Sequence, residues 1–187
     1  MNNDLEPCLG ECDISRRQFL QKALTGFLSF GALAFLSPFF RSWMPSEKTL
    51  LAEKPVRFDI SVLEPGEMMT VMWQGKPVWI LRRTPQMLKA LQEKNASLRD
   101  PHSMMAQQPK GLSQSLRSYQ DEYFVAIGQC THMGCIPMLK KKEFLCPCHG
   151  SRFDLAGRVV KGVPAPRNLD IPPYRFENAG QTIVIGE

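Results

Sequence analysis

The sequence lacks a basic stripe, an internal repeat and the hydropathy of a multi-span membrane protein. Its net charge is +5, and outside the run Lys140-Lys141-Lys142 the basic residues are spread along the chain, so nucleic-acid binding has little support. A mean hydropathy of -0.22 excludes several membrane spans. A chain of 187 residues holds one ordinary domain and an appended segment. We therefore expect a single hydrophobic core.

The N-terminal part combines a twin-arginine motif with one apolar run. Residues 15–22 read Ser-Arg-Arg-Gln-Phe-Leu-Gln-Lys, which is typical of a twin-arginine export signal. The uncharged apolar run that follows, residues 23–40, would span about 27 Å as a helix, close to the hydrocarbon thickness of a bilayer. No clear small-residue cleavage site ends the run, which favours an uncleaved membrane anchor over a removed signal peptide.

The distribution of basic residues predicts the orientation of this anchor. Arg16, Arg17 and Lys22 precede the apolar run and only Arg41 follows it, which places the N-terminus in the cytoplasm and the main domain in the periplasm, at the inner membrane. Twin-arginine export carries folded proteins, which suits a domain whose cofactor is inserted before export. The expected segments are a cytoplasmic tail at 1–22, an anchor at 23–41, a tether at 42–54 and the exported domain at 55–187.

The exported domain has the pattern of an all-β fold with one short helix. Gln74-Gly75 is a two-residue turn between two strand-like segments, which predicts a hairpin. Thr84 and Pro85 are typical of a helix start. Residues 95–118 are polar and aperiodic, and they read as a long surface excursion. The expected strands are residues 56–63, 68–73, 76–83, 123–128, 171–176 and 182–185.

Four of the six cysteines and two of the three histidines fall within residues 130–149. They form two boxes, C-T-H-M-G-C at residues 130–135 and C-P-C-H-G-S at residues 146–151. Two loops that each offer a thiolate and an imidazole can clamp a metal between them. Gly134 and Gly150 would permit tight backbone turns beside it. The role of the other two cysteines, Cys8 and Cys12, stays open.

Zinc is the commonest metal for such ligands, but the spacing argues against it. Structural zinc sites generally pair ligands two to four residues apart, whereas a single residue separates Cys130 from His132, and a four-ligand zinc site would leave two cysteines unused. A Rieske centre uses all six side chains, because two cysteines bind one iron, two histidines bind the other and the remaining cysteines can form a disulfide. A zinc-stabilised, non-catalytic periplasmic domain remains the non-enzymatic alternative.

The two boxes resemble those of the bacterial Rieske iron–sulfur subunits of ubiquinol–cytochrome c reductase, the cytochrome bc complex or complex III. The likeness extends through residues 75–84, 123–128 and 162–169, and with the anchor it covers most of the chain. It implies one Rieske 2Fe-2S cluster in an antiparallel β-sandwich. An inserted cluster-binding subdomain is expected at about residues 127–168, and a single transmembrane helix precedes the sandwich.

The resemblance also implies roles for the box residues. Cys130 and Cys146 would bind the buried iron, and His132 and His149 would bind the outer, solvent-facing iron. His149 and His132 are accordingly the candidate catalytic residues.

The resemblance further implies an inter-loop disulfide between Cys135 and Cys148. The pair is expected only in an oxidising compartment, which agrees with the export signal. Rieske oxygenases and their ferredoxins resemble the ligand pattern but lack this pair. The disulfide therefore favours the reductase family over them.

Three further positions are candidates for tuning the cluster. In the family, a serine at the position of Ser151 donates a hydrogen bond to a bridging sulfide, and a tyrosine two residues later often donates to a ligand sulfur. This chain has Phe153 there, which cannot donate, so we expect a lower reduction potential than in tyrosine-bearing relatives. Residues 162–166, with Pro164 at their centre, resemble the family's proline loop, which covers the cluster from a third side.

The function implied is that of one subunit of a multi-subunit respiratory translocase. His149 would accept a hydrogen bond from quinol at the cytochrome b subunit, and the domain would carry the electron to a c-type cytochrome. Cytochrome b, the c-type cytochrome and quinol are the expected partners, with ubiquinol favoured over menaquinol, in a dimeric complex. The alternative enzyme is an arsenite oxidase small subunit, which shares the signal, boxes and disulfide pair. The anchor and the proline loop favour the reductase.

Overall fold

The computed structural model describes residues 9–52, 54–93, 95–105 and 108–186. The chain divides into two compact units, Met1–Glu47 and Lys48–Glu187. Cys8 lies outside the described residues.

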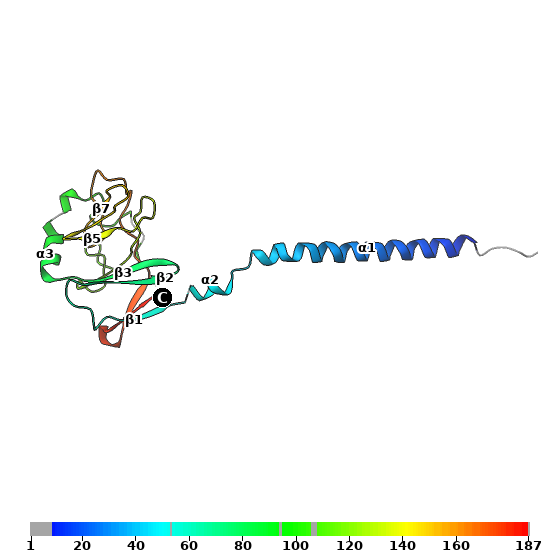
Figure 1. The fold of residues 1–187 in the computed structure, drawn as a ribbon, viewed down its shortest axis with the longest axis horizontal. Helices are drawn as coiled ribbons and strands as arrows, with labels where there is room; N and C mark the ends of the chain where they lie inside the picture. Colours follow the sequence, from blue (N-terminus) through cyan, green and yellow to red (C-terminus); the bar gives the residue numbers. More distant parts are fainter. Residues whose placement is uncertain (1–8, 53, 94, 106–107, 187) are drawn as a thin grey trace, which may run out of the picture. The chain divides into compact units, whose positions relative to one another are not determined.

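The N-terminal unit is built on helix α1, Leu9–Ser42 (Figure 1). The helix begins before the twin-arginine motif instead of after it, so it takes in much of the segment expected as a tail. The described part of the chain has one helical stretch long and apolar enough to cross a membrane, Ser15–Leu51, and its most apolar window has a mean hydropathy of 1.7 and no buried residue. A second, short helix, α2 (Glu47–Ala52), lies within the segment expected as a tether.

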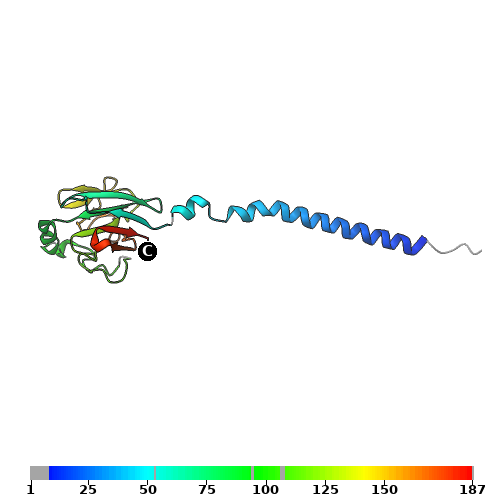
Figure 2. The same ribbon diagram turned by 90° about the horizontal axis from the view of Figure 1, so that it is seen from below.

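Three antiparallel sheets of three strands each form the C-terminal unit (Figures 1 and 2), which confirms the all-β prediction. Their strand orders are β1-β9-β8, β2-β3-β4 and β5-β6-β7. The strands are β1 (Val56–Asp59), β2 (Met68–Trp73), β3 (Lys76–Arg82), β4 (Tyr123–Ile127), β5 (Met138–Lys140), β6 (Glu143–Leu145), β7 (Arg152–Phe153), β8 (Tyr174–Glu177) and β9 (Thr182–Ile185).

The predicted hairpin between β2 and β3 is confirmed, with Trp73 paired to Lys76. Gln74 and Gly75 have φ angles of 50° and 71°, so both adopt the left-handed conformation of a type I′ turn. This turn has the twist that a two-residue hairpin needs.

The predicted helix is α3, Pro85–Glu93, and the amide of Met87 donates to the Thr84 hydroxyl at 3.3 Å, as an N-cap requires. Two short 3-10 turns, η1 (Asn95–Ser97) and η2 (Asn178–Gly180), complete the regular structure.

The first and last strands of the domain lie side by side. Val56 of β1 pairs with Ile185 of β9, and β9 pairs with β8 on its other side. The predicted strands at residues 56–63 and 171–176 are shorter than expected, since β1 ends at Asp59 and β8 begins at Tyr174. This sheet closes the sandwich at the end of the chain.

The prediction of a surface excursion at residues 95–118 is wrong for a good part of that segment. Leu98, Asp100, Ser103, Arg117 and Ser118 are all buried. Their polar atoms find partners inside the fold, as described below, and a hydrogen-bonded polar group can be buried at little cost. The polar composition of this segment therefore wrongly indicated exposure to solvent. The segment's histidine, His102, is exposed.

Trp79 joins two of the sheets. It lies on β3, is 2% exposed, and stacks on Phe144 of β6 with a ring-centroid distance of 4.8 Å. Gly128 follows β4 on the way into the first box, and a Cβ at this position would lie 2.4 Å from the Trp79 ring. The tryptophan thus occupies the space that a side chain at residue 128 would need.

We expect Gly128→Ala to lower the free energy of unfolding by about 1–3 kcal/mol, because the added methyl group overpacks the Trp79 ring. Thermal unfolding of the detergent-solubilised chain measures the change. The same substitution in a Trp79→Phe background should cost less, since the smaller ring leaves space for it. Equal costs in the two backgrounds would contradict the steric account.

Candidate metal centre

The two predicted boxes form two loops with the same backbone pattern. In each loop the amide of the first cysteine donates to the carbonyl of the residue five positions later, and the glycine four positions later donates back to that cysteine's carbonyl, at distances of 2.7–3.1 Å. These bonds join Cys130 to Cys135 and Gly134, and Cys146 to Ser151 and Gly150. The first loop follows β4, and the second connects β6 to β7.

Gly134 and Gly150 make these turns possible by their conformation. Their φ angles are 79° and 71°, in the left-handed region that favours glycine. An added Cβ would meet nothing within 4 Å at either position, so the requirement is conformational and not steric. The expectation of tight turns at these two glycines is confirmed.

Cys130 and Cys146 both carry free thiols, and they are 3% and 1% exposed. Burial raises the pKa of the Cys130 thiol, the adjacent Cys146 thiol raises it further, and hydrogen bonds from the His132 main chain and the Ser151 side chain partly oppose this. Both thiols therefore lie at the buried side of the site. A bound cation would displace their protons, because the thiolate is the metal ligand.

His132 and His149 lie at the opposite, solvent-facing side. Both side chains are exposed, and their rings meet edge to face with centroids 4.8 Å apart. Each loop thus contributes one exposed imidazole and one buried thiol.

The predicted disulfide between Cys135 and Cys148 is confirmed. It joins the two loops with a Cα–Cα distance of 6.6 Å across a sequence separation of 13 residues. The Cys146 sulfur lies within 4.8 Å of both disulfide sulfurs. The disulfide sulfurs carry no thiolate charge, so they brace the site and do not bind a metal.

The donor set fits a Rieske cluster. Such a cluster needs two thiolates on one iron and two imidazoles on the other, and the two loops offer the thiols on the buried side and the imidazoles on the solvent side. A cluster bound here would exchange its electron close to the protein surface, where a partner can approach the exposed imidazoles.

The proline loop contacts both ligand-bearing loops. The hydroxyl of Ser151, which is fully buried, accepts a hydrogen bond from the Ala165 amide at 3.1 Å. The Thr131 hydroxyl donates to the Arg167 carbonyl at 2.6 Å. Pro164 immediately precedes the first of these anchor points and is exposed. The structure therefore brings together the predicted Ser151 and Pro164 at the site.

Phe153 lies immediately beyond the second loop, on β7. It is fully buried, pairs with Phe144 of β6 and forms an antiparallel bridge with Val159. Its ring belongs to the hydrophobic core. That Phe153, which lacks a hydroxyl donor, gives a lower reduction potential than a tyrosine would stays a prediction.

Three buried arginines near the site were not predicted from the sequence. Arg83, Arg117 and Arg158 are at most 1% exposed. Burial lowers the pKa of Arg83 and that of Arg117 to about 10 each, so both remain cationic at neutral pH. Arginine is rarely buried unless its donors are satisfied, and no periodicity in the sequence marks these three positions.

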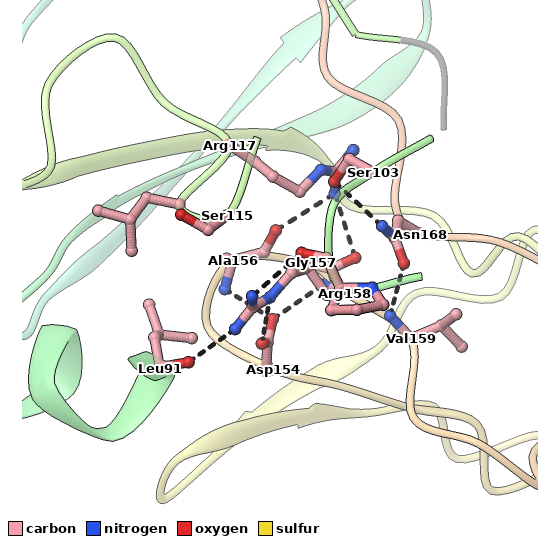
Figure 3. Close-up of polar contacts among 12 residues, drawn as sticks. Leu91, Ser103, Ser115, Arg117, Asp154, Ala156, Gly157, Arg158, Val159 and Asn168 are labelled. Atoms are coloured by element: carbon pink, nitrogen blue, oxygen red, sulfur yellow. Dashed lines mark hydrogen bonds and ion pairs between the residues drawn. The ribbon is translucent and has the colours of Figure 1, made fainter. Parts of the chain in front are cut away.

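Arg117 holds the chain just after the second box (Figure 3). Its Nη1 donates to the carbonyls of Ala156 and Gly157, each at 3.2 Å, and its Nη2 donates to the Leu169 carbonyl at 2.6 Å. A residue from the supposed surface excursion thus fixes two segments that flank the proline loop.

Arg158 and Asp154 form a buried ion pair in the same region, with Nε and Oδ2 2.8 Å apart (Figure 3). Arg158 also donates to the Leu91 carbonyl of α3 at 2.8 Å. The Asp154 carboxylate accepts from the amides of Ala156 and Arg158 as well. The pair therefore ties α3 to the turn after the second box.

Asn168 connects the same segments through its amide. It is fully buried, its Oδ1 accepts from the Val159 amide at 2.8 Å, and its Nδ2 donates to the Asp100 carbonyl and to the Ser103 hydroxyl (Figure 3). Residues from 95–118 therefore pack against the segment 159–168 that follows the second box, which explains their burial.

Residues 55–174 match the family model described as the Rieske [2Fe-2S] domain. This match confirms the predicted cofactor. The fold and the site thus define a Rieske iron–sulfur protein.

Curated relatives specify the family further. The chain is 47% identical to the "Ubiquinol-cytochrome c reductase iron-sulfur subunit" of Allochromatium vinosum, covering 92% of this chain and 88% of that protein. It is 39% identical to the protein of that name from Bradyrhizobium diazoefficiens, covering 87% and 89%. It is 37% identical to the mitochondrial "Cytochrome b-c1 complex subunit Rieske" of Solanum tuberosum, covering 92% and 63%. The chain belongs to the family of iron–sulfur subunits of ubiquinol–cytochrome c reductase, as the boxes predict.

Replacing both disulfide cysteines, as Cys135→Ala with Cys148→Ala, should lower the free energy of unfolding by about 3 kcal/mol, because the loop that the disulfide closes gains entropy in the unfolded chain. Thermal unfolding of the detergent-solubilised chain with and without a reductant measures this. The reductant should destabilise the parent chain and leave the double variant unchanged. A reductant effect of equal size in both would contradict the assignment.

Phe153→Tyr should raise the reduction potential, because the new hydroxyl can donate a hydrogen bond toward a ligand sulfur and stabilise added negative charge. Voltammetry of the loaded chain measures the potential. Phe144→Tyr is the matched control, since Phe144 lies directly across from Phe153 in the β6–β7 pair and is equally buried. An unchanged potential in Phe153→Tyr with the cluster intact would contradict the prediction.

Proposed function

We propose that this chain carries electrons from quinol to a c-type cytochrome as the iron–sulfur subunit of quinol–cytochrome c reductase, with Cys130, Cys146, His132 and His149 as its cluster ligands. The arrangement of two buried thiols and two exposed imidazoles on two disulfide-linked loops is the observation that carries the proposal. The names of the curated relatives agree with it.

The two exposed histidines perform the proton chemistry. The ring nitrogen of His149 that faces solvent accepts a hydrogen bond from the quinol hydroxyl and then holds the proton, and His132 offers a second exposed imidazole beside it. When bound, the cluster supplies a one-electron acceptor adjacent to these rings. The buried cysteines exclude water from the other side of the site.

Apolar side chains close to the histidines in the sequence support a membrane-embedded partner. Met133, Ile136 and Met138 are 73%, 55% and 48% exposed. Apolar side chains that remain exposed on a folded domain are typical of a surface that docks on another protein. This surface suits the cytochrome b subunit, where quinol is bound.

The family and the single apolar helix α1 make the chain a membrane-anchored subunit. We place its N-terminus in the cytoplasm and its Rieske domain in the periplasm, after export by the twin-arginine route, at the inner membrane. The segment at residues 42–54 then acts as the tether along which the domain moves between cytochrome b and the c-type cytochrome. Ubiquinol is the proposed substrate, and the complex is proposed to be a dimer.

Membranes from a strain that lacks this protein test the function. They should lose quinol-dependent reduction of cytochrome c and regain it with the parent gene. The variant Cys146→Ser should restore neither this activity nor bound iron, because one ligand of the buried iron is lost. The variant His102→Gln is the matched control, since His102 is the one histidine outside the two boxes, and it should restore both.

Two outcomes contradict different parts of the proposal. Retained activity in the deletion membranes would remove the functional assignment and leave the cofactor assignment in place. Zinc in the purified chain, without two irons and two sulfides per chain, would reject the cluster ligands themselves.

A further inference from the structure

Arg99, which belongs to neither box, forms hydrogen bonds with the main chain of the proline loop. Arg99 Nη1 donates to the carbonyls of Ala165 and Pro166 at 3.0 and 3.3 Å, and its Nη2 donates to the Val163 carbonyl at 3.1 Å. One guanidinium thus binds three carbonyls within four consecutive residues. Arginine suits this task, because its donors lie in a rigid plane and it stays charged at every relevant pH.

The main chain of Arg99 is itself fixed to the cluster-binding subdomain. Its amide donates to the Val159 carbonyl at 2.9 Å, and the preceding Leu98 forms an antiparallel bridge with Val160. Val159 in turn bridges to Phe153 of β7. The arginine therefore projects from a short segment that extends the sheet beneath the second box.

The proline loop has few other means of holding its conformation. Pro164 and Pro166 lack an amide hydrogen, so between residues 163 and 166 only Val163 and Ala165 can donate from the main chain. The Ala165 amide donates to the Ser151 hydroxyl at 3.1 Å. The loop is thus held on one side by Arg99 and on the other by Ser151.

Ser151 transmits this contact to a ligand-bearing residue. Its carbonyl accepts a hydrogen bond from the Cys146 amide at 2.8 Å, and its side chain counters the raised pKa of the Cys130 thiol. A hydroxyl has a single proton, and an oxygen that already accepts from the Ala165 amide keeps that proton available for the sulfur. The position of the proline loop therefore affects how well Ser151 can donate toward the metal site.

We propose that Arg99 is a positioning residue that holds the proline loop against Ser151 and thereby maintains the Ser151 hydrogen bond to the cluster site. Arg99 is exposed and all its side-chain hydrogen-bond partners in the described chain are main-chain carbonyls. Its loss should loosen residues 163–166, free the Ala165 amide and weaken donation to sulfur. Weaker donation stabilises the reduced site less, so the potential falls.

Two readouts on the full-length, detergent-solubilised chain test this proposal. In Arg99→Ala, hydrogen exchange at the Ala165 amide should become about tenfold faster, the size expected when a charge-assisted hydrogen-bond network is lost. The reduction potential should fall, with the iron content unchanged. Mass spectrometry of a peptide over residues 163–166 isolates the effect, because the segment has only two main-chain amide hydrogens.

Arg99→Lys separates position from charge. Lysine keeps the positive charge but lacks the planar fork that reaches three carbonyls, so its exchange rate and potential should lie between those of the parent and Arg99→Ala. Arg99→Gln gives a second neutral variant should Arg99→Ala fold poorly, and it carries the same expectation as Arg99→Ala.

Arg57→Ala is the matched control. Arg57 is also an exposed arginine, but it pairs with Glu177 in the sheet β1-β9-β8 and not with the proline loop. Its replacement removes the same charge and should leave the Ala165 exchange rate and the potential unchanged.

Parent-like exchange at Ala165 in Arg99→Ala would overturn the proposal. A fall in potential that Arg99→Lys fully restores, with exchange unaltered throughout, would also overturn it, because charge alone would then explain the effect. The potential readout rests on the cluster ligands proposed above, whereas the exchange readout does not. A failure of the ligand assignment would therefore appear in the iron content and leave the exchange result to decide the role of Arg99.

Discussion

Two loops from different parts of the sequence must face each other with thiols inward and imidazoles outward, and the rest of the domain depends on this constraint. The disulfide between Cys135 and Cys148 joins the loops, and the left-handed turns at Gly134 and Gly150 give both the same shape. The resulting asymmetry separates two tasks. In the function proposed for this site, the buried side holds the metal away from water, and the exposed side presents the imidazole that exchanges protons with the substrate.

The surrounding fold keeps these loops rigid by two different means. Aromatic packing links the sheets, as Trp79 stacks on Phe144 and fills the space beside Gly128. Buried arginines fix irregular segments that have no strand partner, because one guanidinium can donate hydrogen bonds to several main-chain carbonyls. Arg117 does this after the second box. Such contacts give loop residues the precision that catalysis and electron transfer require.

Local chemistry predicted much of this structure, and long-range packing accounts for what was missed. The Gln74-Gly75 hairpin, the capped helix after Thr84 and the paired boxes follow from short-range rules, and all are present. The disulfide pairing came through family resemblance. The burial of residues 95–118 could not be predicted, because it depends on Arg158 and Asn168, partners some fifty residues or more away in sequence. Polar side chains that bond main-chain carbonyls leave no periodic pattern.

The most direct test of the proposed site is pulsed EPR of the reduced, loaded chain with ¹⁵N-labelled histidine. The chain has only three histidines, and the account predicts strong hyperfine coupling to two of them, His132 and His149. The His102→Gln variant should give the same spectrum as the parent. Coupling to fewer than two histidine nitrogens, or a change in the spectrum on replacing His102, would contradict the account.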